Sequence, residues 1–305
     1  MGCLFGGYLS VHNEVWLIDI DAGKVEAIRA HGVTIEESFG DQVYHPYAES
    51  DAPGLGEMDL VILFVKAMQS REALDKNRHL IGEHTYLMSL QNGAGHENVM
   101  ADFVAPHHCI IGTTQHNSSF KMPGRIHHGG GGKTYIGMLA SESPFLRVIA
   151  ENFRSCGFDT EISGNIKYHI WNKLFLNSSA SVLTAILQVK LGFIAETPHA
   201  WNLARLLIEE AVSVANADNQ CFDADQVTAD VRNVLVKARD GYTSIYADIR
   251  DGARTEVDTI SGSVIRKARE LGISVPAHEF AAALIHAMEE RSGRGRRGKA
   301  GDILE

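Results

Sequence analysis

The stretch LVILFV at residues 60–65 decides the fold of the N-terminal half, because an uninterrupted apolar run of this length predicts a strand that is buried on both faces. Strands of this kind belong to parallel sheets that are covered by helices. Comparable short runs occur at residues 15–19, 86–90, 109–114 and 134–137. Helical segments are expected between them, at residues 23–30, 70–80 and 145–156. This alternation predicts an α/β fold with a doubly wound parallel sheet.

The pattern becomes helical from about residue 163. Apolar residues recur at helical spacing over residues 201–217, 224–238 and 256–271. Thr255 and Asp258 have the spacing of a capping box, and Gly272 is expected to end the last of these helices. We therefore expect an α/β domain over residues 1–162 and an all-helical domain over residues 163–290. Residues 291–305 are rich in Gly and Arg without periodicity, which predicts a disordered basic tail.

Composition restricts the class of protein. The chain has 305 residues, of which 45% are hydrophobic, so it is long enough for two domains with full cores. A net charge of -10 argues against nucleic acid or an acidic membrane surface as a partner. The four cysteines form no C-x-x-C pair, which favours unpaired thiols in a reducing compartment. There is no basic leader and no apolar run of membrane-spanning length, so we expect a cytoplasmic protein.

The N-terminus resembles part of a dinucleotide-binding βαβ unit. Residues 1–9 form a predicted helix rich in small residues, and the strand that follows ends at Asp19. In the complete unit, a strand and a G-x-G-x-x-G loop precede the helix, and the acidic residue binds the adenosine ribose. Here the first strand and the first two glycines are absent, and Gly2 takes the place of the third glycine, which lets helix and strand pack closely. We expect either a misassigned start or a truncation that removes the central strand and much of the pyrophosphate site.

A polar stripe is predicted on the helix that spans residues 171–183. Lys173, Asn177 and Ser181 are spaced by four residues in otherwise apolar surroundings, so they share one helical face. Burying such a stripe costs free energy unless a polar partner meets it. A substrate could be that partner, which would make Lys173 a proton donor. The alternative is a surface stripe with Lys173 in water.

In their order along the chain, these segments resemble the ketopantoate reductase (2-dehydropantoate 2-reductase) family up to about residue 290. The segments that carry the resemblance are residues 15–19, 31–33, 65–69, 90–97, 122–126, 171–177 and 254–258. The resemblance implies a Rossmann domain followed by a helical domain. It also implies hydride transfer from a reduced nicotinamide cofactor to a 2-oxo acid, in the first place 2-dehydropantoate in pantothenate biosynthesis.

The resemblance also implies roles for single residues. Lys173 would be the general acid, and Glu256 would face the substrate and help to position the lysine. Asn177, Ser181 and Ser244 would lie on the substrate side. On the cofactor side the resemblance places Gly2, Asp19, Lys66 and Asn92. Lys66 and Asn92 follow predicted strands, and ligands bind at the carboxyl ends of strands in this fold.

Each of these residues also has a purely structural explanation. Glu256 could stabilise a helix N-terminus, Asn92 could belong to an Asn-Gly turn, and Lys66 could be a solvated strand end. His127 and His128 lack the spacing of a metal site, and the glycines that follow them favour a flexible hairpin loop. The pair at residues 107 and 108 is interpreted in the same way, so we predict no metal.

Departures from the family leave the substrate and the cofactor open. Ser181, Gly241 and Leu191 stand where the family has asparagines, and each lost contact to a polar group costs about 1–3 kcal/mol. A different or more apolar substrate is therefore an alternative. Family custom favours NADP(H), whereas the carboxylates of Asp19 and Asp21 should repel a 2'-phosphate and favour NAD(H).

Three hypotheses follow from the sequence. The first is a ketopantoate reductase, and the second is an NAD-dependent D-2-hydroxyacid (mandelate-type) dehydrogenase of the same fold. The third is a non-catalytic homologue, because much of the nucleotide loop is missing. A helical second domain is compatible with a homodimer.

Overall fold

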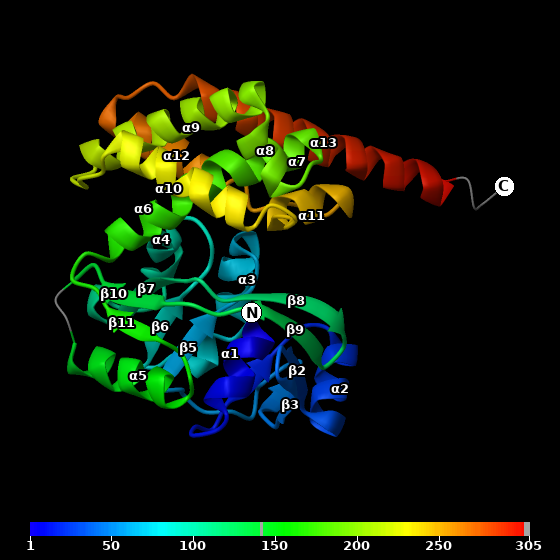
Figure 1. Ribbon diagram of the computed structural model, residues 1–305. Helices are drawn as coiled ribbons and strands as arrows, with labels where there is room; N and C mark the ends of the chain where they lie inside the picture. The colour runs from blue at the N-terminus through cyan, green and yellow to red at the C-terminus, as the bar shows by residue number, and fades with distance from the viewer. Residues whose placement is uncertain (141–142, 302–305) are drawn as a thin grey trace. The chain divides into compact units, whose positions relative to one another are not determined.

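The computed structural model describes residues 1–140 and 143–301 (Figure 1). The chain divides into two compact units. The first contains Met1–Gln91 and His96–His169, and the second contains Asn92–Gly95 together with the residues from Ile170 onward. The second unit therefore takes four residues from the loop after a strand of the first.

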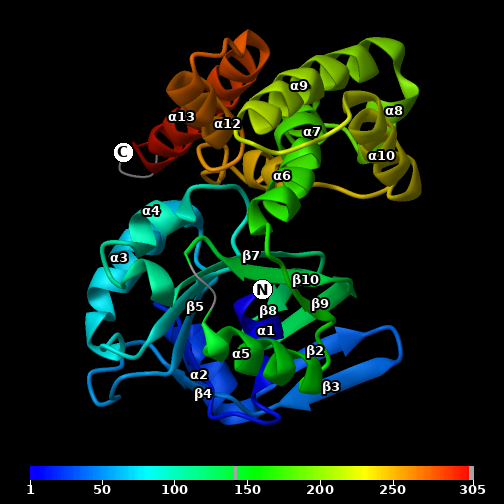
Figure 2. The ribbon, with the colours of Figure 1, turned by 90° about the vertical axis from the view of Figure 1, so that its left-hand side faces the viewer.

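A five-stranded sheet forms the core of the first unit, in the order β11-β10-β7-β6-β5. Its strands are β5 (Leu60–Leu63), β6 (Tyr86–Ser89), β7 (Cys109–Thr114), β10 (Thr134–Met138) and β11 (Thr160–Ile162). Strands β5, β6 and β7 run parallel, and β10 is antiparallel to β7. Helix α5 (Pro144–Ser155) covers one face, and α3 (Ser70–Lys76) and α4 (His96–Met100) lie on the other (Figure 2). The α/β class and the strands β5, β6, β7 and β10 are confirmed, whereas β11 was not predicted.

The sheet is interrupted at its centre. Strand β1 (Trp16–Ile18) pairs only with β4 (Tyr47–Glu49), in a separate two-stranded sheet, and β5 pairs only with β6. In the Rossmann order 3-2-1-4-5-6, β4 and β1 correspond to strands 3 and 2, and β5 corresponds to strand 4. Among the described residues no strand fills position 1.

Helix α1 (Gly2–Leu9) packs against both sheets. Phe5 is buried and stacks on Phe158 with 4.1 Å between the ring centroids. A Cβ at Gly6 would lie 2.4 Å from Leu17 Cδ2, whereas one at Gly2 would lie 3.7 Å from Phe64. The close packing of helix on strand that we expected at Gly2 is therefore found at Gly6, one turn further along α1.

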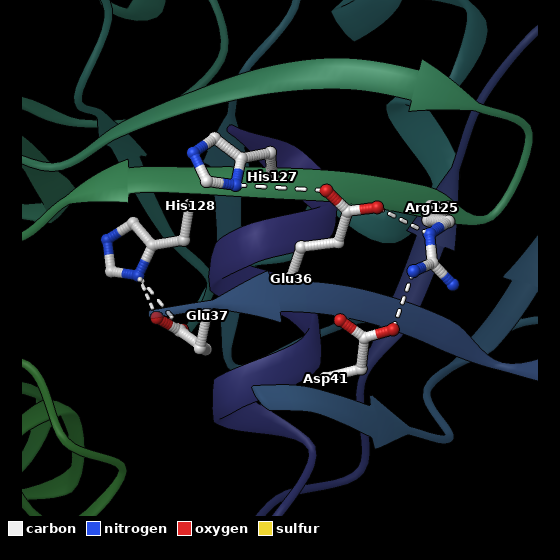
Figure 3. A network of polar contacts seen from close by, with 6 residues as sticks. All are labelled: Glu36, Glu37, Asp41, Arg125, His127 and His128. Atoms are coloured by element: carbon white, nitrogen blue, oxygen red, sulfur yellow. Dashed lines mark hydrogen bonds and ion pairs between the residues drawn. The ribbon is translucent and has the colours of Figure 1, made fainter. Parts of the chain in front are cut away.

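A four-stranded sheet, β3-β2-β9-β8, was not predicted. It contains β2 (Val33–Glu37), β3 (Gly40–Tyr44), β8 (Asn117–Met122) and β9 (Arg125–Gly130). The prediction of a flexible loop at His127 and His128 is wrong, because both residues lie in β9. Ion pairs with β2 hold this strand: His128 Nδ1 lies 2.9 Å from Glu37 Oε1, and Arg125 Nε donates to Glu36 Oε1 at 2.7 Å (Figure 3). His107 and His108 lie in a 3₁₀ turn instead of a loop.

The second unit is helical, as expected. Its elements are α6 (Ile166–Leu176), which begins in the first unit, the π-helix η4 (Asn177–Ser181), α7 (Val182–Leu187), α8 (Leu191–Glu196), α9 (Pro198–Ala217), α10 (Ala224–Lys237), α11 (Ser244–Arg250), α12 (Ser261–Leu271) and α13 (Pro276–Gly301). The long helix α9 buries small residues such as Ala204 and Ala211, which allow its neighbours to approach closely. No described helix is long and apolar enough to cross a membrane.

Two expectations at the C-terminal helices were wrong. Helix α12 begins at Ser261 instead of residue 256, and the Thr255–Asp258 capping box does not form, because the N–H of Thr255 donates to Glu289. Gly272 does end the helix, with φ of 69°. Helix α13 is described as far as Gly301. Residues 302–305 of the expected tail lie outside the described residues.

Candidate active site

Lys173 lies on α6 and is partly buried beside the core residues Trp171 and Leu174. Burial lowers the pKa of the Lys173 amine to about 8, and the negative charge of Glu256 acts in the opposite direction and raises it. A surface stripe would require a fully solvated amine. The lowered pKa shows that the Lys173 amine is not fully solvated. At pH 7 most molecules carry the ammonium form, which can nonetheless give up its proton near neutral pH.

The helix widens directly after this lysine. Residues Asn177–Ser181 form a π-helix, in which the hydrogen bonds run to the fifth residue. A step of four residues overshoots a full α-helical turn by about 40°. A π turn contains more residues than an α-helical turn, so a step of four residues within it does not exceed one full turn. The π turn therefore limits the rotation of Ser181 around the helix axis away from the face that carries Lys173. Single π turns inside α-helices occur frequently at functional sites.

Ser244 is the exposed first residue of α11. The residue before it, Thr243, caps this helix by accepting the N–H of Tyr246 at 3.2 Å. The Thr243 hydroxyl also lies 2.9 Å from that of Thr184 and donates to the carbonyl of Ser181 at 3.4 Å. The start of α11 is thereby tied to the end of the π turn. Sequence reasoning missed Thr243, although a threonine before a helical pattern is a known N-cap signal.

Glu256 lies in a turn before α12. Its carbonyl accepts the N–H groups of Thr259 and Ile260, both at 3.1 Å. We call residues 254–260 the Glu256 turn. The structural explanation of Glu256 as a helix N-terminal residue is wrong, because α12 begins five residues later, at Ser261.

Asn92 belongs to the short segment that joins the second unit. The N–H of Ala94 donates to the carbonyl of Thr259 at 3.0 Å. Gly93 has φ of +96°, and a Cβ there would lie 2.0 Å from the same carbonyl oxygen. The Asn-Gly turn thus exists, and it also anchors the segment on the Glu256 turn.

The second unit therefore contains all five residues expected to act on the substrate: Lys173, Asn177, Ser181, Ser244 and Glu256. It also contains Asn92, which was expected on the cofactor side. The Coulomb interaction of Lys173 with Glu256 and the hydrogen bonds described above link their four segments. An ammonium group, amides and hydroxyls together can bind an anionic oxo acid and protonate an oxygen.

Three of the four residues expected around the cofactor, Gly2, Asp19 and Lys66, lie in the first unit, and the fourth, Asn92, lies in the second. Asp19 follows β1, and Lys66 follows β5. Gly2, at the start of α1, lies beside Phe64, which is close to Lys66 along the chain. These positions correspond to the carboxyl ends of parallel strands and to a helix N-terminus, where this fold binds nucleotides.

The two carboxylates after β1 have different roles. Asp21 caps α2 (Ala22–His31) by accepting the N–H groups of Gly23 at 3.0 Å and Lys24 at 3.2 Å. The Lys24 amine lies 3.4 Å from Asp19 Oδ2 and 3.8 Å from Asp21 Oδ2. Two carboxylates and one ammonium leave a local excess of negative charge.

Gln91 is a further residue that sequence reasoning did not single out. Its side chain is buried and donates to the carbonyl of Val65 at 2.6 Å and to the Ser70 hydroxyl at 2.9 Å. Its side-chain oxygen accepts the Ser89 hydroxyl at 2.9 Å. Gln91 thus ties together the ends of β5 and β6, from which Lys66 and Asn92 follow. Its position at the end of an apolar strand is the feature of the sequence from which Gln91 could have been predicted.

Comparison with known proteins places the chain among reductases of 2-oxo acids. The model for "Ketopantoate reductase PanE/ApbA" matches residues 1–141, and that for its C-terminal part matches residues 165–289. The chain is 31% identical to 2-dehydropantoate 2-reductase of Lactococcus lactis over 299 residues, or 95% of each chain. The same enzyme of Pyrococcus horikoshii is 30% identical over 295 residues, or 96% of each.

A solved structure is also similar. The ternary structure of D-mandelate dehydrogenase with NADH and anilino(oxo)acetate superposes with a TM-score of 0.89 and 28% sequence identity. The match covers 95% of this chain and 96% of that chain.

Proposed function

The chain belongs to the ketopantoate reductase family, and we propose that it reduces a 2-oxo acid with a nicotinamide cofactor, in the first place 2-dehydropantoate to pantoate in pantothenate biosynthesis. The observation that carries the proposal is the Lys173 amine, with a pKa of about 8, beside Glu256. The curated relatives support 2-dehydropantoate as the substrate, because they carry that name and match along nearly the whole chain.

The proposed chemistry assigns the proton to Lys173. A bound nicotinamide cofactor supplies the hydride, which adds to C2 of the oxo acid. Negative charge then develops on the carbonyl oxygen, and Lys173 donates a proton from Nζ to that oxygen, which gives the hydroxyl group. The neutral amine takes up a proton from solvent before the next turnover. Glu256 favours the ammonium form, and Asn177 and Ser244 supply polar groups for the substrate.

For the cofactor we propose a preference for NADH. The N–H groups of the first turn of α1, together with Gly2, would face the pyrophosphate, and Lys66 would lie on the same side. Asp19 would accept the ribose hydroxyls. The excess of negative charge formed by Asp19, Asp21 and Lys24 disfavours the 2'-phosphate of NADPH.

A second candidate is an NAD-dependent D-2-hydroxyacid dehydrogenase, and two residues of the second unit favour it. The N–H of Leu191 donates to the carbonyl of Gly241 at 3.2 Å, so the two positions lie side by side. Both stand where amide side chains were expected, and Leu191 is buried in the helical core. A site without these amides favours a more apolar 2-oxo acid over ketopantoate with its hydroxyl group.

A turnover panel tests these proposals. Ketopantoate and phenylglyoxylate, a bulkier and more apolar 2-oxo acid, are each offered with NADH and with NADPH. Turnover of ketopantoate supports the first candidate, and a higher kcat/KM for phenylglyoxylate with NADH supports the second. If neither acid is reduced with either cofactor and the melting temperature responds to neither, the non-catalytic homologue is favoured.

We also propose that the enzyme is cytoplasmic and forms a homodimer. Cys3, Cys109, Cys156 and Cys221 are free thiols, which is consistent with a reducing compartment. Light scattering on the purified protein measures the oligomeric state, and a monomer would contradict the second part.

A further inference from the structure

Helix α13 contacts the Glu256 turn through one carboxylate. The N–H of Thr255 donates to Glu289 Oε1 at 2.7 Å. Thr255 is buried, and the side chain of Glu289 is only 14% exposed. Because Thr255 directly precedes Glu256, this bond fixes the backbone at the start of the turn.

A second contact of α13 reaches the same turn. His286 Nδ1 lies 3.1 Å from Glu289 Oε2, and His286 Nε2 lies 3.2 Å from Asp258 Oδ1. Asp258 follows Glu256 by two residues. Burial alone would raise the pKa of Glu289, but its hydrogen bonds with Thr255 and His286 outweigh burial and lower it. Glu289 is therefore ionised at neutral pH.

The far end of the turn is held separately. The carbonyl of Thr259 accepts the N–H of Ala94 at 3.0 Å, and Gly93 packs directly against it. Glu256 thus lies between two anchors, one on α13 and one on the segment that carries Asn92. Loss of either anchor frees the backbone that aims the Glu256 carboxylate at Lys173.

We propose that Glu289 is a positioning residue, which acts on the reaction by holding the Glu256 turn so that Glu256 faces Lys173. The proposal rests on the proposed function, because it deepens the role of the same site. Glu289 itself needs no contact with substrate or cofactor.

A purely structural carboxylate in the same unit provides a matched control. Glu210, on α9, accepts the N–H groups of Ala277 at 2.9 Å and His278 at 3.0 Å at the start of α13. Its side chain is 17% exposed, and its hydrogen bonds also outweigh burial and lower its pKa. None of the hydrogen bonds described for Glu210 involves the Glu256 turn. Removing Glu210 should therefore cost stability without changing the titration of Lys173.

The experiment compares full-length Glu289→Ala, Glu289→Gln and Glu210→Ala with the wild type. We measure kcat and KM for the best 2-oxo acid across pH, and we titrate the Lys173 amine by 13C NMR of labelled lysine side chains. In Glu289→Ala we expect kcat to fall about 10- to 100-fold with a smaller change in KM. The pKa of Lys173 should fall, because Glu256 no longer raises it.

The Gln variant separates position from charge. Glu289→Gln and Glu289→Ala both remove the negative charge, but Gln keeps an oxygen that can accept the N–H of Thr255. We therefore expect Gln to retain most of kcat and a titration near that of the wild type. Glu289→Asp keeps the negative charge, but its shorter side chain withdraws the oxygen that accepts the N–H of Thr255. It should therefore lower the pKa of Lys173, as Glu289→Ala does. Glu289→Asp takes the place of Glu289→Ala in the experiment if Glu289→Ala does not fold.

Three results would overturn the proposal: an unchanged Lys173 titration in Glu289→Ala, equal shifts in the Ala and Gln variants, or an equal shift in Glu210→Ala. If the wild type reduces no 2-oxo acid, the proposed function fails. The NMR titration still decides whether Glu289 controls the pair of Lys173 and Glu256.

Discussion

At the scale of single residues, Lys173 experiences two opposing influences. Burial disfavours its charged form, and Glu256 favours it, and the resulting pKa of about 8 lies below the ordinary lysine value of 10.5. A difference of this size corresponds to roughly 3 kcal/mol between the two protonation states. The acid that donates to a developing alkoxide works best when its pKa lies near the working pH, and this lysine meets that condition.

Replacing the amine should therefore remove most of the activity. In Lys173→Ala we expect kcat to fall by about 10²–10⁴, which is typical for the loss of a general acid. Lys173→Arg should not restore it, because a guanidinium keeps its proton at every working pH. Steady-state kinetics at saturating substrate measure both variants, and near-normal turnover in Lys173→Ala would exclude the lysine from the mechanism.

The cofactor preference is also set by single charges. Asp19→Ser removes the carboxylate expected to bind the ribose hydroxyls, so kcat/KM for NADH should fall about 10- to 100-fold, while the value for NADPH falls less or rises. Asp21→Asn is the control, since Asn still caps α2. Asp21→Asn should change the ratio of kcat/KM for NADH to kcat/KM for NADPH less than Asp19→Ser does. A wild type that prefers NADPH would contradict the role given to Asp19.

At the scale of elements, the site depends on two departures from regular structure. The π turn at Asn177–Ser181 follows Lys173, and the left-handed Gly93 lets its segment pack on the Glu256 turn. The first lies on the helix that carries Lys173, and the second fixes the segment that carries Asn92.

Gly93→Ala tests the second of these departures. The new Cβ would lie 2.0 Å from the carbonyl oxygen of Thr259, which is backbone and cannot rotate away. Alanine is also strained at the positive φ of this position. Because of the clash and the strain together, we expect the free energy of unfolding to fall by about 2–4 kcal/mol and kcat to be lower. Gly164→Ala is the matched control, because nothing lies within 4 Å of its added Cβ. Thermal unfolding measures both, and equal melting temperatures would contradict this packing.

The sequence predicted those elements whose side chains are uniformly apolar or regularly spaced. The strands at 60–65 and 109–114 are of this kind, and so is α9. The sheet β3-β2-β9-β8 was missed because β8 is largely exposed and β9 is held by ion pairs, so apolar alternation is weak. The start of α12 was misplaced because Val257, Ile260 and Val264 are buried at helical spacing, although the first two belong to the turn. The polar stripe was visible, but the π turn was not.

The same distinction applies to the site. Lys173, Asn177 and Ser181 could be proposed from their polar stripe, and Lys66 and Asn92 from their places after strands, whereas Ser244 and Glu256 required the family resemblance. Thr243 donates to the carbonyl of Ser181, and Glu289 accepts the N–H of Thr255. Both contacts join residues far apart along the chain, and a single sequence gives little sign of them.

At the scale of the whole molecule, the chain divides into two compact units. The first unit contains Gly2, Asp19 and Lys66, which we propose on the cofactor side, and no described strand fills position 1 of its Rossmann order. The second unit contains Lys173, the proposed proton donor, and the residues proposed around the substrate.

Cofactor binding can be tested independently of turnover. At a concentration 100-fold above its Kd, NADH should stabilise the protein by about 2.7 kcal/mol and raise the melting temperature by a few degrees. Lys173→Ala should keep this shift, because the lysine lies outside the first unit. An unchanged melting temperature at millimolar NADH and NADPH would contradict nucleotide binding by this chain.

If the amine of Lys173 donates the proton, the pH dependence of kcat should follow the titration of that amine. Reduction needs the ammonium form, so kcat for reduction should be constant at low pH and should fall tenfold per pH unit above about pH 8. Oxidation of the hydroxy acid needs the neutral amine and should rise through the same range. Proton donation by Lys173 predicts that Lys173→Ala loses both dependences. A profile that is flat across pH 8 in the wild type, or one that Lys173→Ala retains, would contradict it.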